Sequence, residues 1–188
     1  MRCNTLTPQN KNMTTSLSKR VLIPNKTITC GGVKKEELLD RVATEYRLAL
    51  DAHNMMIRPE FTVTDARETV QLVFLSFDDL KFTRNAYTYE FMTEQFCTDW
   101  SSEYLNGQKI RLCLCGDGAQ LRLQYPEQSK GERILIAMDP IDCGDDEPLV
   151  FNVGYVNSRR SLLGEYAPPD RLWSLDWLIA FRLCDITV

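Results

Sequence analysis

Apolar residues recur along the chain at spacings typical of helices and strands, and the first such stretch predicts a helix over residues 33–53. Its apolar positions mostly lie three or four residues apart, the interval that brings side chains onto one face of a helix. They are Leu39, Val42, Ala43, Tyr46, Ala49, Leu50 and His53. Charged residues fill most positions between them, so we expect this face to pack on the core and the opposite face to meet solvent.

Two further stretches predict one strand and one helix in the middle of the chain. Residues 70–77 are almost continuously apolar, which is typical of a strand covered on both of its faces. A second helix is predicted over residues 88–105, because four large apolar residues follow one another at intervals of four. These residues are Met92, Phe96, Trp100 and Tyr104.

Residues 109–125 predict a β-hairpin that turns at Asp117-Gly118. This dipeptide is typical of a two-residue turn between antiparallel strands. With that turn, the apolar residues of the two strands face one another on one side and the polar or small residues on the other. The apolar pairs are Leu114 with Leu121, Leu112 with Leu123, and Ile110 with Tyr125.

The last third of the chain predicts strands over residues 133–138 and 149–156, and it ends in an ambiguous segment. Large apolar residues occupy every odd position from Trp173 to Leu183, which fits a strand. The segment 171–184 also fits a buried helix, and Asp170 would serve as its N-cap. We favour the helix because Pro168-Pro169-Asp170 is a typical helix entry, and we keep the strand as the alternative.

Together these elements predict an α+β fold with a mainly antiparallel sheet of about five or six strands, packed by two or three helices. Residues 1–20 carry four basic side chains and no acidic one, with few large apolar residues. Such a segment buries too little surface to offset the entropy of ordering, so we expect a disordered basic tail. The remaining residues, 21–188, are expected to form a single domain.

Composition and charge narrow the classes of function. The 188 residues carry a net charge of −4, and the basic tail masks a charge of −8 on residues 21–188. A body this acidic speaks against a broad nucleic-acid-binding face, which needs clustered lysine and arginine. No run of about 18 apolar residues is present to span a membrane. We therefore expect neither nucleic acid nor a membrane as a partner.

The seven cysteines predict a location rather than a metal site. Their number is odd, they form no C-x-x-C pair, and no apolar signal segment precedes them. Reduced thiols in a cytoplasmic protein are the simplest interpretation. His53 is the single histidine, which excludes any site that needs two imidazoles. The sequence therefore predicts no metal and no cofactor.

The strongest candidate for a ligand site is the segment 157–170, which we interpret as a long loop. Loops of this length in a small domain are often functional. Arginine side chains there could hold a carboxylate or phosphate through two parallel hydrogen bonds. The candidate ligand-binding residues are Arg159, Arg160, Tyr166 and Arg171.

Other features are interpreted as structural. The acidic run from Asp139 to Glu147 does not match a calcium-loop spacing and reads as a solvated connection. Gly31-Gly32 before the first helix lacks the spacing of a phosphate-binding loop.

Aromatic residues near the C-terminus are candidates for a subunit interface, where tryptophan is enriched. The predicted interface residues are Trp173, Trp177 and Phe181.

No motif identifies an enzyme class, and the sequence leaves three hypotheses of function, of which nucleic-acid association through the basic tail ranks last. The first is an intracellular binding domain that meets another protein or a second copy of itself, as a homodimer. The alternative is a small-molecule-binding protein or enzyme, with a pocket between sheet and helices and a small anionic ligand. Whether the protein is an enzyme stays open.

Overall fold

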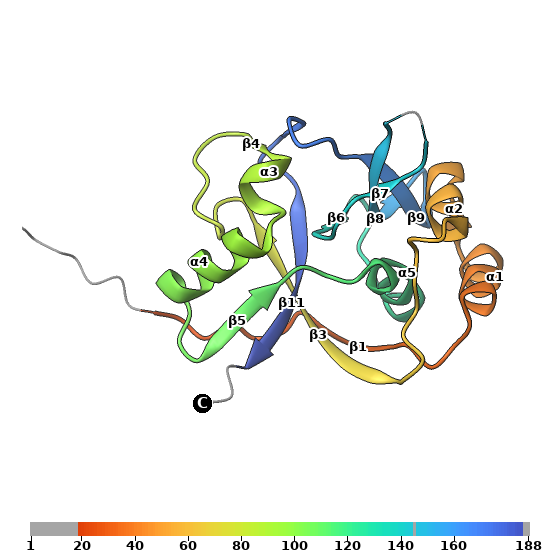
Figure 1. Ribbon diagram of the computed structural model, residues 1–188, viewed down its shortest axis with the longest axis horizontal. Helices are drawn as coiled ribbons and strands as arrows, with labels where there is room; N and C mark the ends of the chain where they lie inside the picture. The colour runs from red at the N-terminus through yellow and green to blue at the C-terminus, as the bar shows by residue number, and fades with distance from the viewer. Residues whose placement is uncertain (1–18, 145, 186–188) are drawn as a thin grey trace, which may run out of the picture.

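A curled β-sheet forms the centre of the computed structural model, which describes residues 19–144 and 146–185 (Figure 1). Within these residues the sheet has nine strands, and a second sheet has two. The strands of the large sheet are β1 (Lys26–Cys30), β2 (Arg47–Leu48), β3 (Glu68–Ser76), β5 (Gln108–Arg111), β6 (Arg133–Ile136), β7 (Ile141–Asp142), β8 (Pro148–Val156), β9 (Arg159–Tyr166) and β11 (Leu178–Asp185). The small sheet pairs β4 (Ala86–Tyr87) with β10 (Leu172–Trp173).

The order of the strands makes this sheet mixed. Its main path runs β1-β3-β11-β6-β8-β9-β2, with β5 paired to β11 and β7 paired to β8. Most neighbours are antiparallel, but β6 runs parallel to β11 and β2 runs parallel to β9. The prediction of a mainly antiparallel sheet of five or six strands is therefore wrong. It missed the short strands, whose two to five residues give little period-two pattern to detect.

Five helices lie in the described part of the chain, more than the two or three predicted. They are α1 (Lys35–Glu45), α2 (Leu50–Ile57), α3 (Thr88–Phe91), α4 (Glu94–Tyr104) and α5 (Cys115–Gln124). None of these helices has the length and apolar composition needed to cross a membrane. The predicted helix over 33–53 is split into α1 and α2 by β2, and the one over 88–105 is split into α3 and α4.

The predicted hairpin over 109–125 is wrong, because residues 115–124 form the helix α5. Asp117 lies in its first turn, where the carboxylate accepts a hydrogen bond from the backbone N–H of Leu114 at 2.9 Å. The helix packs against α1, β1, β8 and β9, and it is buried from Asp117 to Leu123 (Figure 1). A helix surrounded by core needs no solvent-exposed polar face, and the polar residues of α5 are themselves buried, so the helical period that sequence reasoning looks for is absent.

The C-terminal segment follows the alternative interpretation, since its apolar residues belong to strands and not to a helix. β11 pairs with β3 on one side and with β5 and β6 on the other, so it lies in the middle of the sheet. Asp170 caps no helix but lies in the turn before β10. The residues between 157 and 170 also differ from the prediction. They do not form a long loop, because β9 pairs with β8 along its whole length.

Several elements match the sequence prediction. The strand expected over 70–77 is confirmed as β3, and those over 133–138 and 149–156 are confirmed as β6 and β8. The predicted tail lies outside the described residues except for Lys19 and Arg20. The backbone N–H of Arg20 donates to the carbonyl oxygen of Tyr104 at 2.8 Å, at the C-terminal end of α4.

Candidate functional site

The predicted ligand residues are divided between the two ends of β9. Arg159 and Arg160 begin this strand, directly after the β8–β9 turn, in which Asn157 and Ser158 both have positive φ. Tyr166 ends the strand, about 23 Å away at the rise of an extended chain. Arg171 lies further on, 3.7 Å from a carboxylate oxygen of Glu165 and 4.3 Å from the centre of the Trp173 ring. The structure therefore brings only Arg159 and Arg160 together.

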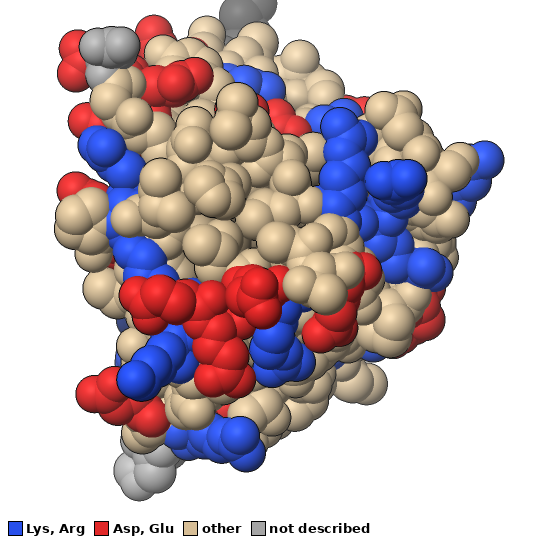
Figure 2. Space-filling view, turned by 90° about the vertical axis from the view of Figure 1, so that its right-hand side faces the viewer, with Lys and Arg blue, Asp and Glu red and all other residues tan. Residues whose placement is uncertain are grey.

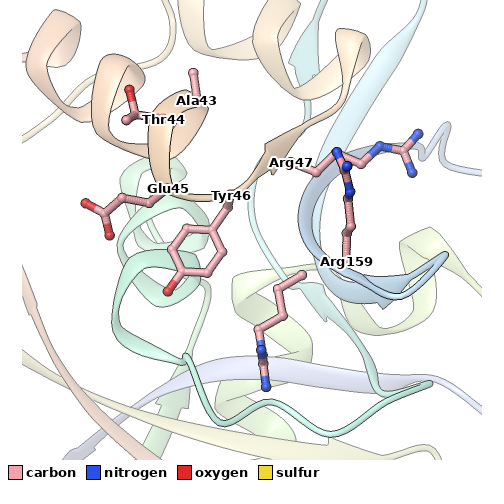
Figure 3. A pocket seen from close by; sticks show the side chains of 7 residues that line it. Ala43, Thr44, Glu45, Tyr46, Arg47 and Arg159 are labelled. Carbon is pink, nitrogen blue, oxygen red and sulfur yellow. The ribbon is translucent and has the colours of Figure 1, made fainter.

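A surface pocket lies beside these two arginines, where α1 ends and β2 begins (Figure 3). It has a volume of about 440 Å³. Its wall is formed by Ala43, Thr44, Glu45, Tyr46, Arg47, Arg159 and Arg160. Figure 3 shows Arg47 and Arg159 extending close to each other, while Glu45 extends away on the other side. We call this feature the arginine pocket.

Backbone pairing places Arg47 beside the β9 arginines. Arg47 on β2 lies opposite Ser161 in the parallel pair with β9, so it shares a face of the sheet with Arg159, two residues away. Arg47 and Arg159 are exposed, although Ser161 on the same face is buried. Arg160 points to the other face and is half-buried, and its guanidinium lies 5.0 Å from the centre of the Tyr155 ring.

A fourth arginine, Arg122 on α5, lies directly behind the pocket wall. It is fully buried, and its guanidinium stacks 4.6 Å from the centre of the Tyr46 ring. Two of its nitrogens donate to the side-chain oxygen of Gln128 and the carbonyl oxygen of Tyr125. Burial, together with the nearby charge of Arg160, lowers the pKa of Arg122 to about 10. Arg122 thus stays positively charged near neutral pH.

These four arginines lack acidic partners in residues 19–144 and 146–185. Arg47, Arg122, Arg159 and Arg160 take part in none of the ion pairs there. The Nε atoms of Arg122 and Arg160 are buried and have no hydrogen-bond acceptor. The carboxylate of Glu45 on the wall is 3.7 Å from Arg41 instead. An uncompensated buried charge is costly, so the arrangement is favourable for a bound anion.

On the face of the molecule that carries α1 and α2, charge is unevenly distributed (Figure 2). Basic side chains gather on both sides of this view and beside an acidic patch in its lower half, although the chain as a whole carries a net charge of −4. A local positive field of this kind attracts small anions even when the whole protein is acidic. The net charge of residues 21–188 therefore does not exclude an anionic ligand.

A second cluster of charged groups lies at the N-terminus of α5 and is built differently. Arg182 donates to both oxygens of Asp117, at 2.6 and 2.7 Å, and to Glu68 at 2.8 Å. The thiol of Cys30 donates to Asp117 at 3.2 Å. Burial and the charge of Asp117 raise the pKa of that thiol, so it stays protonated and is a poor nucleophile. Since its charges are paired, we assign this cluster to stability.

The predicted interface residues do not form a surface. Trp173, Trp177 and Phe181 are 1%, 7% and 0% exposed, and the two tryptophan rings pack edge to face at 5.3 Å. Trp173 Nε1 donates to the hydroxyl of Thr88 at 2.9 Å. These rings therefore fill the core of this chain and offer little area to a partner.

The remaining sequence candidates stay separate from the arginine pocket. His53 lies inside α2, and the acidic run 139–147 contains β7. Among the described residues no group of three or more His, Cys, Asp and Glu side chains could hold a metal ion. Six cysteines are described, and all six are free thiols.

Sequence reasoning missed Tyr46, Arg47 and Arg122 as site residues. Tyr46 and Arg47 were placed within a continuous helix, and Arg122 was placed on the polar face of a hairpin. Only the pair Arg159-Arg160 carried a usable signal, namely two adjacent arginines at the end of an apolar stretch. The chain matches no protein-family model, no curated protein and no solved structure, so its function is inferred from its own residues.

Proposed function

We propose that this protein binds a small anionic ligand in the arginine pocket. The observation that carries the proposal is Arg122, a fully buried guanidinium with an unpartnered Nε, next to Arg160 on the pocket wall. An anion held by Arg47, Arg159 and Arg160 would be separated from the guanidinium of Arg122 only by the ring of Tyr46. Its negative charge would therefore offset the buried positive charge of Arg122. Charge-assisted hydrogen bonds to such an anion are among the stronger polar contacts in proteins.

The pocket supports binding and not catalysis. Its wall has no nucleophile next to a general base, since the ionisable groups on it are three arginines, Tyr46 and Glu45. Its volume of about 440 Å³ falls in the range of small-molecule sites. We therefore propose a binding protein, in line with the second hypothesis from the sequence.

The experiment is a titration with inorganic phosphate at constant ionic strength, followed by calorimetry, for the protein and two variants. Arg47→Gln and Arg159→Gln remove exposed side chains, so both variants should fold. Each should weaken binding about tenfold or more, because a hydrogen bond to a charged group contributes about 1.5–3 kcal/mol and about 1.4 kcal/mol corresponds to a factor of ten.

The matched control is Arg111→Gln, which removes an exposed arginine from β5, far from the pocket (Figure 1). It changes the net charge equally, so it should leave phosphate binding unchanged. Equal weakening in all three variants would mean attraction by overall charge only, and no binding by the wild type would refute the proposal.

A structural role of the pocket arginines predicts a different result. α1 ends at the pocket and has no basic residue in its last turn, so Arg47 could neutralise the negative end of the helix dipole. In that case Arg47→Gln would lower the melting temperature without changing phosphate affinity. Measuring both quantities on the same variant separates the two roles.

The other expectations from the sequence remain predictions. A homodimer is tested by light scattering, and a cytoplasmic location by imaging of the tagged full-length chain. Neither is needed for the arginine pocket, whose wall comes from a single chain.

A further inference from the structure

The arginines reach the pocket from different directions. Arg159 and Arg160 are consecutive on β9, so their side chains leave opposite faces of the sheet. Arg47 comes from a second strand on the same face as Arg159. All three nevertheless line one pocket, at the edge of the sheet where both faces can be reached. The hydrogen-bond donors therefore do not lie in one plane.

This arrangement suits a tetrahedral group better than a planar one. A carboxylate has two oxygens in one plane, and a single arginine can satisfy both of them. A phosphoryl group has three outer oxygens that point in different directions, so several arginines can bind it together. Its charge is also larger, because a phosphate monoester carries about −1.5 to −2 at pH 7.

The pocket is larger than a phosphoryl group needs. Its volume is about 440 Å³, and the wall that the arginines leave uncovered includes Ala43, Thr44 and the ring of Tyr46. These groups offer methyl, hydroxyl and aromatic surface, which suits an uncharged organic portion. Glu45 extends away from Arg47 and Arg159, so it does not face the side where the anion would sit (Figure 3).

We infer that the arginine pocket binds the phosphate monoester of a small organic molecule. Arg47, Arg159 and Arg160 hold the phosphoryl oxygens, Arg122 adds positive charge from behind Tyr46, and the organic portion lies against Ala43, Thr44 and Tyr46. This inference rests on the proposed function, because it names the class of anion that the same site binds.

Three probes that share one phenyl ring test it: phenyl phosphate, phenyl sulfate and benzoate. The sulfate ester has the same tetrahedral shape with one charge, and benzoate is planar. At pH 7.5 and constant ionic strength, phenyl phosphate should bind at least tenfold more tightly than either. It should also bind more tightly than inorganic phosphate, and Arg111→Gln should not change its affinity.

A second measurement uses pH. The second ionisation of a phosphate monoester has a pKa of about 6, so at pH 5 only about one molecule in ten is doubly charged. The advantage of phenyl phosphate over phenyl sulfate should therefore shrink by about five- to tenfold between pH 7.5 and pH 5. Phenyl sulfate keeps its charge over this range, so a change in its affinity with pH would come from the protein. The groups concerned are Glu45 and Tyr46 on the wall, and Arg122 and Tyr155 behind it.

The outcomes separate this inference from the proposed function. If benzoate or phenyl sulfate binds as tightly as phenyl phosphate at pH 7.5, the site binds anions but is not selective for a phosphoryl dianion, and the inference fails alone. If inorganic phosphate binds as tightly as phenyl phosphate, the organic portion is not recognised and the inference fails in that part. If none of the anions binds, both the inference and the proposed function are refuted.

Discussion

Replacing Asp117 with asparagine removes a buried negative charge at the point where α5 meets β11. The carboxylate is 1% exposed and the side chain of its partner Arg182 is 15% exposed, so water compensates little for the lost charge. In the variant, an uncharged amide would face Arg182 in place of two charge-assisted hydrogen bonds. Glu68 would remain within 2.8 Å of the guanidinium and offset part of the loss.

The expected loss of stability is about 3 kcal/mol, at the lower end of the range for removing one partner of a buried ion pair. For a chain of this size, about 1 kcal/mol shifts the melting temperature by about 2–4 °C. We therefore expect the melting temperature of Asp117→Asn to fall by about 6–12 °C. Urea unfolding followed by circular dichroism measures the free energy directly, with the slope m unchanged.

Glu68→Gln is the matched control, since it removes the other carboxylate that Arg182 contacts. The side chain of Glu68 is 41% exposed, and exposed ion pairs contribute about 0–1 kcal/mol. A loss below about 1 kcal/mol in Asp117→Asn, or equal losses in the two variants, would refute the reasoning that burial makes the Asp117 contact dominant.

Other predictions address packing and the thiols. Gly118→Ala should lower stability by about 1–3 kcal/mol, because the new Cβ would lie 2.8 Å from Cβ of Phe151. Gly116→Ala should instead raise stability by about 0.5–1 kcal/mol, because its Cβ has only ordinary contacts and alanine favours a helix more than glycine does. Urea unfolding of this pair is the measurement. Burial raises the pKa of Cys97 from its ordinary value of 9.0 to about 12 in the folded protein. Between these two pH values the thiol ionises in the unfolded chain but not in the folded one, so the free energy of unfolding should fall as pH rises from 9 to about 12. Cys97→Ala should make this fall with pH less steep. Alkylation of the native protein at pH 8, read by mass spectrometry, should modify the half-buried thiols and spare the buried ones. The half-buried thiols are Cys115, Cys143 and Cys184, and the buried ones are Cys30, Cys97 and Cys113.

The sequence predicted elements whose local pattern agrees with their surroundings in the fold. β3 and β8 are long apolar strands, so their patterns suffice to place them. It failed for α5, where the alternation of apolar and polar residues fits a hairpin as well as a buried helix. Asp117-Gly118 is typical of a turn, yet Asp117 is also suited to the first turn of a helix, where its carboxylate accepts the N–H of Leu114. The two structures are distinguished by long-range contacts, namely the ion pair with Arg182 and the packing of α5 against α1, β1, β8 and β9.

The arginine pocket and the largest error in the first half of the chain have one cause. A continuous helix over 33–53 would carry Tyr46 and Arg47 on its own surface, unrelated to β9. Instead the backbone becomes extended at Tyr46, Arg47 and Leu48 pair with β9, and the N–H of Ala49 donates to the carbonyl oxygen of Leu162 at 3.0 Å. These contacts join residues more than a hundred positions apart, so no local pattern could reveal them. The break also places Arg47 beside Arg159. The local preference for a helix is overruled here by contacts between distant parts of the chain, and the same contacts assemble the wall of the arginine pocket.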